Sequence, residues 1–544
     1  MKKSIIMGLG LISIIPTLIS CNNSTVKITF NPNGGTVDVD SKTVSMGDKV
    51  SLPKPTKEGR HFLGWYTGFD DDSKLITEST EITDNYNLYA RWDYYNVSYY
   101  DNKDNKIFDF DVPDSGYVYD YGITWDKELN ILCHQDMDVK AVIDSNSSIL
   151  KTTIASYGLK SKNYTIPFEY NKEYFTKDNE AFMAKYSLLA SIETESQEEL
   201  EKLLTDSDFT NIKTIGYKTK EKTGYTLATL DIGNKKLVMI IIKSFRYTHE
   251  WSYNFKVGND NDHQGFIECR DFVLEGLEDY LSTYDLNHTE LLITGYSKGG
   301  AIAGLIGKEL LENNTLGISN DKFLVYTFEA PTSSLTNGES NIYNYVNEAD
   351  LIVNLYPYNM LRPGTDISIY SDKINKLMNQ FDSSIKFKSF TTNSKYQADK
   401  DYPKYIIDSL LAYTKKETES PNEIKTRQEF NTNYATSMSY VIDKVFSLDF
   451  DTIIALYNSI KENITIIIAN KDLIISMIEN YLQSANISYE FNELQTHINN
   501  VIDFINGPAS ILKTEFIFNN SNLSRMIQMH FPIVTYVLLL NHFK

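Results

Sequence analysis

The stretch LLITGYSKGGAIAG, from Leu291 to Gly304, contains the clearest structural signal in the sequence. An apolar run leads into GYSKG at residues 295–299, and a run of small residues follows. This order predicts a buried strand, a tight turn and a closely packed helix. Such a nucleophile elbow exposes a serine, here Ser297, at the carboxyl end of a strand. The glycines on either side let strand and helix approach each other, and the N–H groups after the serine can stabilise an oxyanion. The alternative is a glycine-rich turn of an α/β protein in which the serine has no catalytic role.

The N-terminal residues have the pattern of an export signal. Basic residues open the chain, an apolar stretch runs from Ile5 to Ile19, and the letters LISC end at Cys21. A basic segment followed by a short apolar one is typical of a secretory signal rather than of a membrane span. The LISC ending resembles a bacterial lipobox, which implies cleavage before Cys21 and a diacylglycerol on its thiol. We therefore expect a lipoprotein signal peptide (1–20), a lipidated linker (21–25) and anchoring at the extracytoplasmic face of the cell membrane. An ordinary signal peptide with an incidental cysteine is the alternative.

Composition limits the classes of partner. The formal net charge of −20 argues against nucleic acid or an anionic surface as the main partner. No later segment has 18 consecutive apolar residues, so no further membrane span is expected. Besides Cys21, the chain has only Cys133 and Cys269, which suggest neither a disulfide framework nor a zinc site.

Residues 26–92 predict a small β-rich module. Short alternating strands are separated by turn signals at NGG (33–35), PKP (53–55) and EG (58–59). The phrases FNPNGG, FLGWY and LYARW resemble the Listeria–Bacteroides repeat of internalin-type bacterial surface proteins. That resemblance implies a β-grasp-like unit. A spacer role is favoured over the alternative, binding of a cell-wall or protein partner.

The rest of the chain divides into two further segments. Residues 93–167 alternate apolar and polar positions and predict a β-rich linker or second module. From about residue 168 to 544 the pattern changes. A helical period covers 179–205, a hairpin with a buried strand covers 226–245, and helices and strands then alternate through the elbow, which predicts an α/β fold.

An elbow serine needs a histidine base. In α/β-hydrolases the order along the chain is serine, acid, histidine, which leaves His497, His530 and His542 as candidates after Ser297. His497 lies on the face of a predicted helix, and His542 lies close to the chain end, where fraying is expected. His530 introduces the last strongly apolar helix, so it is the favoured base.

The acid partner is expected in a loop that follows a strand. Asp350 comes shortly after the predicted strand Ile342 to Val346, where a carboxylate can orient the imidazole. Glu348 is the second candidate. The alternative for Asp350 is a simple helix cap.

These residues resemble the class 3 (fungal-type) lipase family, over about Tyr170 to Lys544. The family's characteristic phrases recur in its own order, which is more specific than any one phrase alone. They are SFRYT…W…NF (244–255), HQGF (263–266), GYSKGG (295–300), YTFEAP (326–331), NEADLIV…L…P (347–357) and HFPIVTY (530–536).

The resemblance implies a role for each matched residue. Ser297 corresponds to the nucleophile, Asp350 to the acid and His530 to the base. Thr248 and Lys298 correspond to the oxyanion donors. The implied fold is an α/β-hydrolase, and no metal or organic cofactor is expected.

Three positions depart from the family pattern, whereas His263 matches a residue that the family keeps for structure. Tyr247 replaces a glycine beside the oxyanion loop, where a bulky side chain would reshape the site. Glu329 replaces the glycine of TFGAP. Tyr296 replaces the histidine before the serine.

Helical patterns between Asp350 and His530 predict a helical insertion over about 360–520. They cover 402–413, 426–446, 452–468 and 473–482. The insertion would cap the active site and shape an acyl pocket, or it is a purely structural bundle.

The sequence thus predicts a membrane-anchored extracytoplasmic serine ester hydrolase acting on lipid or other carboxylic esters. A catalytically inactive surface-binding or adhesin lipoprotein with a hydrolase fold is the main alternative, and a triad acting on peptides or thioesters is a second.

Overall fold

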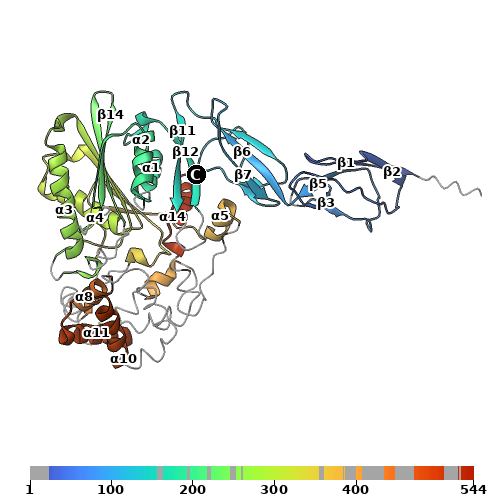
Figure 1. Cartoon of the computed structure of the whole chain (residues 1–544). Helices are drawn as coiled ribbons and strands as arrows, with labels where there is room; N and C mark the ends of the chain where they lie inside the picture. Colours follow the sequence, from blue (N-terminus) through green and yellow to red (C-terminus); the bar gives the residue numbers. More distant parts are fainter. Residues whose placement is uncertain are drawn as a thin grey trace, which may run out of the picture. The chain divides into compact units, whose positions relative to one another are not determined.

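The chain forms two compact units, described here from a computed structural model (Figure 1). The first unit comprises residues up to 98 together with 108–118 and 131–138, and the second comprises 99–107, 119–130 and 139–544. The structure describes residues 24–70, 72–155, 163–192, 196–216, 222–244, 253–258, 261–354, 360–383, 385, 400–406, 434–446, 471–507, 525 and 528–544.

The repeat module in the first unit is a five-stranded mixed sheet. Its strands are β1 (Thr25–Asn31), β2 (Ser41–Ser45), β3 (Phe62–Tyr66), β4 (Leu75–Ile76) and β5 (Tyr86–Trp92), in the order β2-β1-β5-β3-β4. Strand β1 runs parallel to β5 and antiparallel to β2. Alternate residues of β1 are buried because its apolar residues occupy every second position. Trp65 and Trp92 fill the core, where Phe62 packs edge-on against both rings.

Further short strands follow the module. They are β6 (Tyr94–Tyr100), β7 (Lys106–Pro113), β8 (Tyr117–Val118), β9 (Ile131–Leu132) and β10 (Met137–Lys140), which form a three-stranded sheet β10-β6-β7 and a pair β8-β9.

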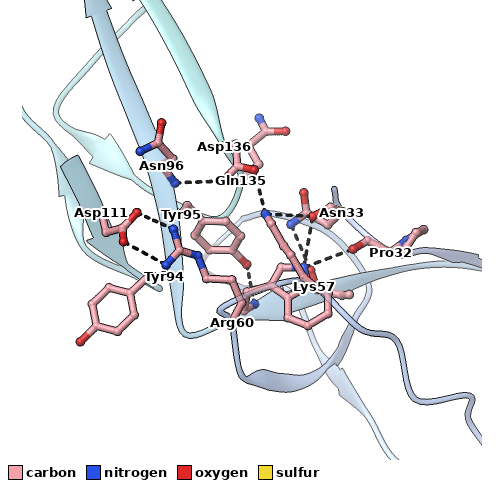
Figure 2. A network of polar contacts seen from close by, with 12 residues as sticks. Pro32, Asn33, Lys57, Arg60, Tyr94, Tyr95, Asn96, Asp111, Gln135 and Asp136 are labelled. Atoms are coloured by element: carbon pink, nitrogen blue, oxygen red, sulfur yellow. Dashed lines mark hydrogen bonds and ion pairs between the residues drawn. The ribbon is translucent and has the colours of Figure 1, made fainter. Parts of the chain in front are cut away.

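Polar contacts join the repeat module to the later segments of the first unit (Figure 2). Lys57 Nζ lies 2.7 Å from Asp136 Oδ2, and Arg60 makes a two-pronged contact of 2.9 and 2.5 Å with Asp111. Asn33, in the FNPNGG turn, donates from Nδ2 to the carbonyl oxygen of His134 at 2.8 Å. The repeat is therefore fixed to the residues that follow it within this unit.

The second unit is built on a seven-stranded sheet in the order β13-β14-β15-β16-β17-β18-β19. Its strands are β13 (Thr210–Ile215), β14 (Tyr225–Ile232), β15 (Lys235–Ile242), β16 (Thr289–Tyr296), β17 (Phe323–Phe328), β18 (Ile342–Val346) and β19 (Thr365–Ser368). The hairpin β14–β15 is antiparallel, and β15 to β19 run parallel. The antiparallel pair β11 (Ser148–Ala155) and β12 (Asn163–Tyr170) precedes this sheet in the sequence.

Helices cover both faces of the large sheet (Figure 1). On one face, α3 (Gln264–Leu281) and α4 (Lys298–Asn313) pack on one set of alternate strand residues, including Ile240 and Ile293. On the other face lies α1 (Glu180–Ile192). There, Thr294 of β16 donates a hydrogen bond to the Ser187 carbonyl oxygen at 3.2 Å. The strands read as continuous apolar runs because both faces are buried.

Additional helices belong to the same unit. They are α2 (Gln197–Asp206), α5 (Ile374–Phe381), α8 (Thr436–Phe446), α10 (Lys471–Ser484), α11 (Phe491–Asn506) and α14 (Pro532–His542). Helices α8, α10 and α11 share an apolar cluster centred on Leu482, Leu494 and Ile498. No helix among the described residues is long and apolar enough to cross a membrane.

The predicted helical insertion is described in part. Helices α8 and α10 fall on two of the predicted patterns, whereas the pattern at 452–468 lies outside the described residues. Residues 365–368, at the start of the predicted insertion, are instead the last strand of the sheet. Their sequence TDIS is too short and polar to stand out as a strand.

Candidate active site

The elbow is formed where β16 ends and α4 begins. Ser297 lies between them with φ 54° and ψ −124°, a strained backbone that non-glycine residues rarely adopt. A Cβ atom on Gly295 would lie 2.3 Å from the Gly299 backbone, and one on Gly299 would lie 2.4 Å from the Ile242 carbonyl oxygen. Glycine is therefore required on both sides of the serine by close packing.

Three side chains from distant parts of the chain meet at this turn. His530 Nε2 is 2.8 Å from Ser297 Oγ, and His530 Nδ1 is 2.5 Å from Asp350 Oδ2. Asp350 is fully buried, whereas the His530 side chain keeps 15% of its surface exposed. The carboxylate is thus shielded from water, whereas the His530 ring is partly open.

Local structure fixes the two partners of the serine. Asp350 follows β18 in a turn, and its second oxygen, Oδ1, accepts the Ile352 N–H at 2.8 Å. His530 lies just before α14, whose first residue, Pro532, is well suited to a helix start. With both Asp350 oxygens occupied, the carboxylate is oriented to hold a proton on His530 Nδ1 and leave Nε2 to accept one from Ser297.

Comparison with known families agrees with this geometry. Residues 225–360 match the family model described as lipase (class 3). The second unit contains a class 3 lipase domain. Its fold is the α/β-hydrolase that the sequence predicts, and the predicted enzyme class, a lipase-like serine ester hydrolase, is confirmed. Residues 27–91 match the Listeria–Bacteroides repeat domain, which confirms that resemblance as well.

Solved structures similar to parts of this chain include fungal lipases of low sequence identity. A fungal lipase–inhibitor complex shares 19% identity over 36% of this chain and 83% of its own, with a TM-score of 0.30. A lipase from Rhizopus microsporus var. chinensis shares 18% over 36% and 76%, with a TM-score of 0.28. The Rhizomucor miehei lipase–propeptide complex shares 16% over 48% and 78%, with a TM-score of 0.29. No curated protein matches the chain significantly.

Of the two predicted oxyanion donors, one lies in the described part of the lipase domain. Lys298 is the first residue of α4 and directly follows Ser297, so its N–H lies at the positive end of the helix dipole. Thr248 and its neighbour Tyr247 lie outside the described residues, and so does Cys21.

The two other departures of the lipase domain from its family, Tyr296 and Glu329, lie in one polar network. Tyr296 Oη donates to the His530 carbonyl oxygen at 2.8 Å and lies 3.0 Å from Thr535 Oγ1. Thr535 Oγ1 lies 3.1 Å from Glu329 Oε1. Burial, and then the charge of Asp350, raise the pKa of the Glu329 carboxyl well above its usual range. The two substitutions, which are separate in the sequence, therefore belong to one hydrogen-bond network.

Asn347 connects the acid loop to the base. Its Nδ2 donates to the Met529 carbonyl oxygen at 3.2 Å, one residue before His530. Its Oδ1 accepts the Ala349 N–H, and its own N–H donates to Glu329 Oε2 at 3.0 Å. The family motif includes Asn347, but only the structure reveals these contacts. Thr535 gave no sequence signal beyond being a polar residue in an apolar helix.

The remaining candidates have other positions. His263 caps α3 and accepts the Phe266 N–H, in keeping with a structural role. His497 lies in α11 beside Ser437, and His542 is the last residue of α14, with its ring against Tyr345. Glu348, the second acid candidate, is exposed. Among the described residues, no group of three or more His, Cys, Asp and Glu side chains could hold a metal ion.

Proposed function

We propose that Ser297 is the nucleophile of this serine ester hydrolase. The observation that carries the proposal is the unbroken pair of hydrogen bonds from Ser297 Oγ through His530 to Asp350. In the first step, His530 Nε2 takes the Ser297 proton as Oγ bonds to the ester carbonyl carbon. The buried Asp350 carboxylate stabilises the imidazolium that forms.

The resulting oxyanion needs donors that are already in place. The Lys298 N–H at the start of α4 is one, and Thr248 is proposed as the other by its match to the family motif. As the tetrahedral intermediate collapses, the bond to the alcohol oxygen breaks and His530 returns the proton to that oxygen. Water, deprotonated by His530, then attacks the acyl carbon. As the bond to Ser297 Oγ breaks, His530 returns the proton to Oγ and the carboxylic acid leaves.

Hydrolysis of chromogenic esters tests this assignment. The purified protein is expected to hydrolyse p-nitrophenyl butyrate and p-nitrophenyl palmitate, and Ser297→Ala to lose the activity by about a thousandfold or more. Preference for the long acyl chain would support lipid esters as the natural class. Equal activity in wild type and Ser297→Ala would exclude Ser297 as the nucleophile.

We further propose that the enzyme acts outside the cytoplasm, anchored by lipid on Cys21. The support is the sequence pattern of residues 1–21. Metabolic labelling with an alkyne fatty acid is expected to mark the wild-type protein and to place it in the membrane fraction. Cys21→Ala should lose the label. A wild-type protein without label would contradict the anchor.

For the repeat, a spacer role is proposed rather than binding of a cell-wall or protein partner. The support is that only one copy is visible in the sequence. Replacing the repeat by an unrelated small domain is expected to leave ester hydrolysis by the anchored protein unchanged. If the same replacement abolished binding of the protein to cell-wall material, the repeat would have a binding role instead.

A further inference from the structure

Three hydrogen bonds link four oxygen atoms into a row that ends at the backbone of His530, the proposed base. From Glu329 Oε1 the distance to Thr535 Oγ1 is 3.1 Å, and from there to Tyr296 Oη it is 3.0 Å. Tyr296 Oη is 2.8 Å from the carbonyl oxygen of His530. All three side chains are buried, so water does not replace these bonds.

Each of the three contacts requires one hydrogen atom. The His530 carbonyl can only accept, so Tyr296 must donate its single O–H to it. Tyr296 then has only a lone pair to offer Thr535, which must donate its own single O–H to Tyr296. No hydrogen remains on Thr535 for the contact with Glu329. An ionised Glu329 would leave one contact between two lone pairs.

We infer that Glu329 is a neutral carboxylic acid that donates its proton to Thr535, and that it is a positioning residue for His530. The hydrogen bonds then run in one direction, from Glu329 through Thr535 and Tyr296 to the His530 backbone. This inference rests on His530 being the base of the proposed function.

The surroundings of Glu329 favour the neutral form. Its side chain is fully buried, and the charged or titratable groups facing it are Asp350, Arg362 and Tyr296. Asp350 already carries the negative charge that pairs with His530, and a second carboxylate beside it would be repelled. The Asn347 N–H and Arg362 act in the opposite direction, but burial and the charge of Asp350 outweigh them and raise the pKa of Glu329.

The other oxygen of Glu329 fits the same assignment. Oε2 accepts the backbone N–H of Asn347 at 3.0 Å, as the carbonyl oxygen of a carboxylic acid would. Glu329 also has φ 49°, in the left-handed region that favours glycine. That backbone is strained for a residue with a side chain, and the strained residue is the one that ties the acid loop to the base.

An infrared difference spectrum tests the protonation state directly. We expect the spectrum of wild type minus Glu329→Gln at neutral pH to contain the C=O stretching band of a carboxylic acid. A difference spectrum with only carboxylate bands would overturn the inference. This readout is independent of ester hydrolysis, so it stands even if the proposed function fails.

Matched variants test the positioning role. Gln can donate to Thr535 from Nε2 and accept the Asn347 N–H at Oε1, as the neutral acid does, whereas Leu can do neither. We expect Glu329→Leu to lower kcat by about tenfold to a hundredfold and Glu329→Gln to restore most of it, with KM little changed. Equal losses in both variants would overturn the inference. They would mean that Thr535 donates to Glu329 in the natural protein, so that the Nε2 group of Gln would face a second donor.

A third variant covers the case in which Glu329→Leu does not fold. Thr535→Val keeps the shape of the side chain and removes the middle of the row. We expect a loss of kcat similar to that of Glu329→Leu, and a shift of the carboxylic acid band as its acceptor disappears. Full activity in Thr535→Val would contradict the positioning role.

Discussion

Asp350 is held at both of its oxygens, by the Ile352 N–H and by His530 Nδ1. At the scale of the residue, this double contact explains why a single carboxylate can select the histidine tautomer. Replacing one oxygen by an amide nitrogen would place a donor where His530 also donates. The imidazole would then favour the tautomer that carries its proton on Nε2, and Nε2 could not accept the Ser297 proton.

For this reason Asp350→Asn is expected to lower kcat for p-nitrophenyl butyrate by about three to four orders of magnitude with little change in KM. The matched control is Glu348→Gln, two residues earlier and exposed, which should stay within about twofold of wild type. If Glu348→Gln lost the activity and Asp350→Asn kept it, the assignment of the acid would be wrong.

The raised pKa of Glu329 also predicts a pH dependence of stability. A folded state that keeps a proton the unfolded state has lost becomes less stable as pH rises, by up to about 1.4 kcal/mol per pH unit. We expect the free energy of unfolding of wild type, relative to Glu329→Gln, to fall as pH rises from about 4.3, the usual pKa of glutamic acid, towards the raised value. Urea titrations of both proteins at several pH values measure this. A difference that stays constant with pH would show that the pKa is not raised.

At the scale of the element, the elbow depends on contact between β15 and the start of α4. Gly299→Ala would push a methyl group to 2.4 Å from the Ile242 carbonyl oxygen. We expect a loss of about 1–3 kcal/mol in the free energy of unfolding, measured by urea denaturation.

Gly304 provides the matched control because it lies in the same helix, where the nearest atom to an added Cβ is 3.5 Å away in Pro363. Gly304→Ala should leave stability unchanged or raise it by up to about 1 kcal/mol, since alanine favours the helix. Equal effects at the two positions would contradict the close-packing account.

The acid loop is the second element on which the site depends. Asn347→Ala removes the side-chain bonds to Ala349 and Met529, so Asp350 and His530 lose a common support. We expect stability to fall by about 1–3 kcal/mol and kcat by about tenfold or more. Denaturation and steady-state kinetics measure the two effects. Unchanged kcat would show that the triad keeps its geometry without this link.

At the scale of the whole molecule, the repeat and the later segments of the first unit are expected to unfold together. Lys57 and Arg60 each bind a carboxylate beyond the repeat (Figure 2). Asn33 also binds a residue beyond it, the carbonyl oxygen of His134. Exposed ion pairs contribute about 0–1 kcal/mol each, so the part-buried hydrogen bond of the Asn33 side chain should matter most.

The variant Asn33→Ala is therefore expected to increase the rate of limited proteolysis between the repeat and residue 138 more than Lys57→Ala does. Ester hydrolysis should stay at the wild-type level in both variants. A larger effect of Lys57→Ala would show that the ion pair, rather than the asparagine, holds the segments together.

The sequence predicted those features that depend on local pattern. The apolar runs before Ser297 and in residues 237–242 stand out because both faces of a parallel strand are buried. The family match covers residues 225–360, and motif order pointed to Ser297, Asp350 and His530, which the structure brings within hydrogen-bonding distance.

Features that depend on long-range contacts could not be predicted. Tyr296 and Glu329 were visible as substitutions, but their connection runs through Thr535, 206 positions from Glu329 and 239 from Tyr296. No local pattern encodes such a meeting. The strand at 365–368 was missed because its position at the sheet edge is set by pairing with β18 rather than by an apolar run of its own.

Labelling of the purified protein by a fluorophosphonate probe tests most directly whether Ser297 is an activated nucleophile. Wild type is expected to be labelled at Ser297, identified by mass spectrometry. Ser297→Ala should not be labelled. The folded His530→Ala variant should react at least about a thousandfold more slowly than wild type. A folded wild-type protein that resists the probe, or that is labelled equally in Ser297→Ala, would contradict the account.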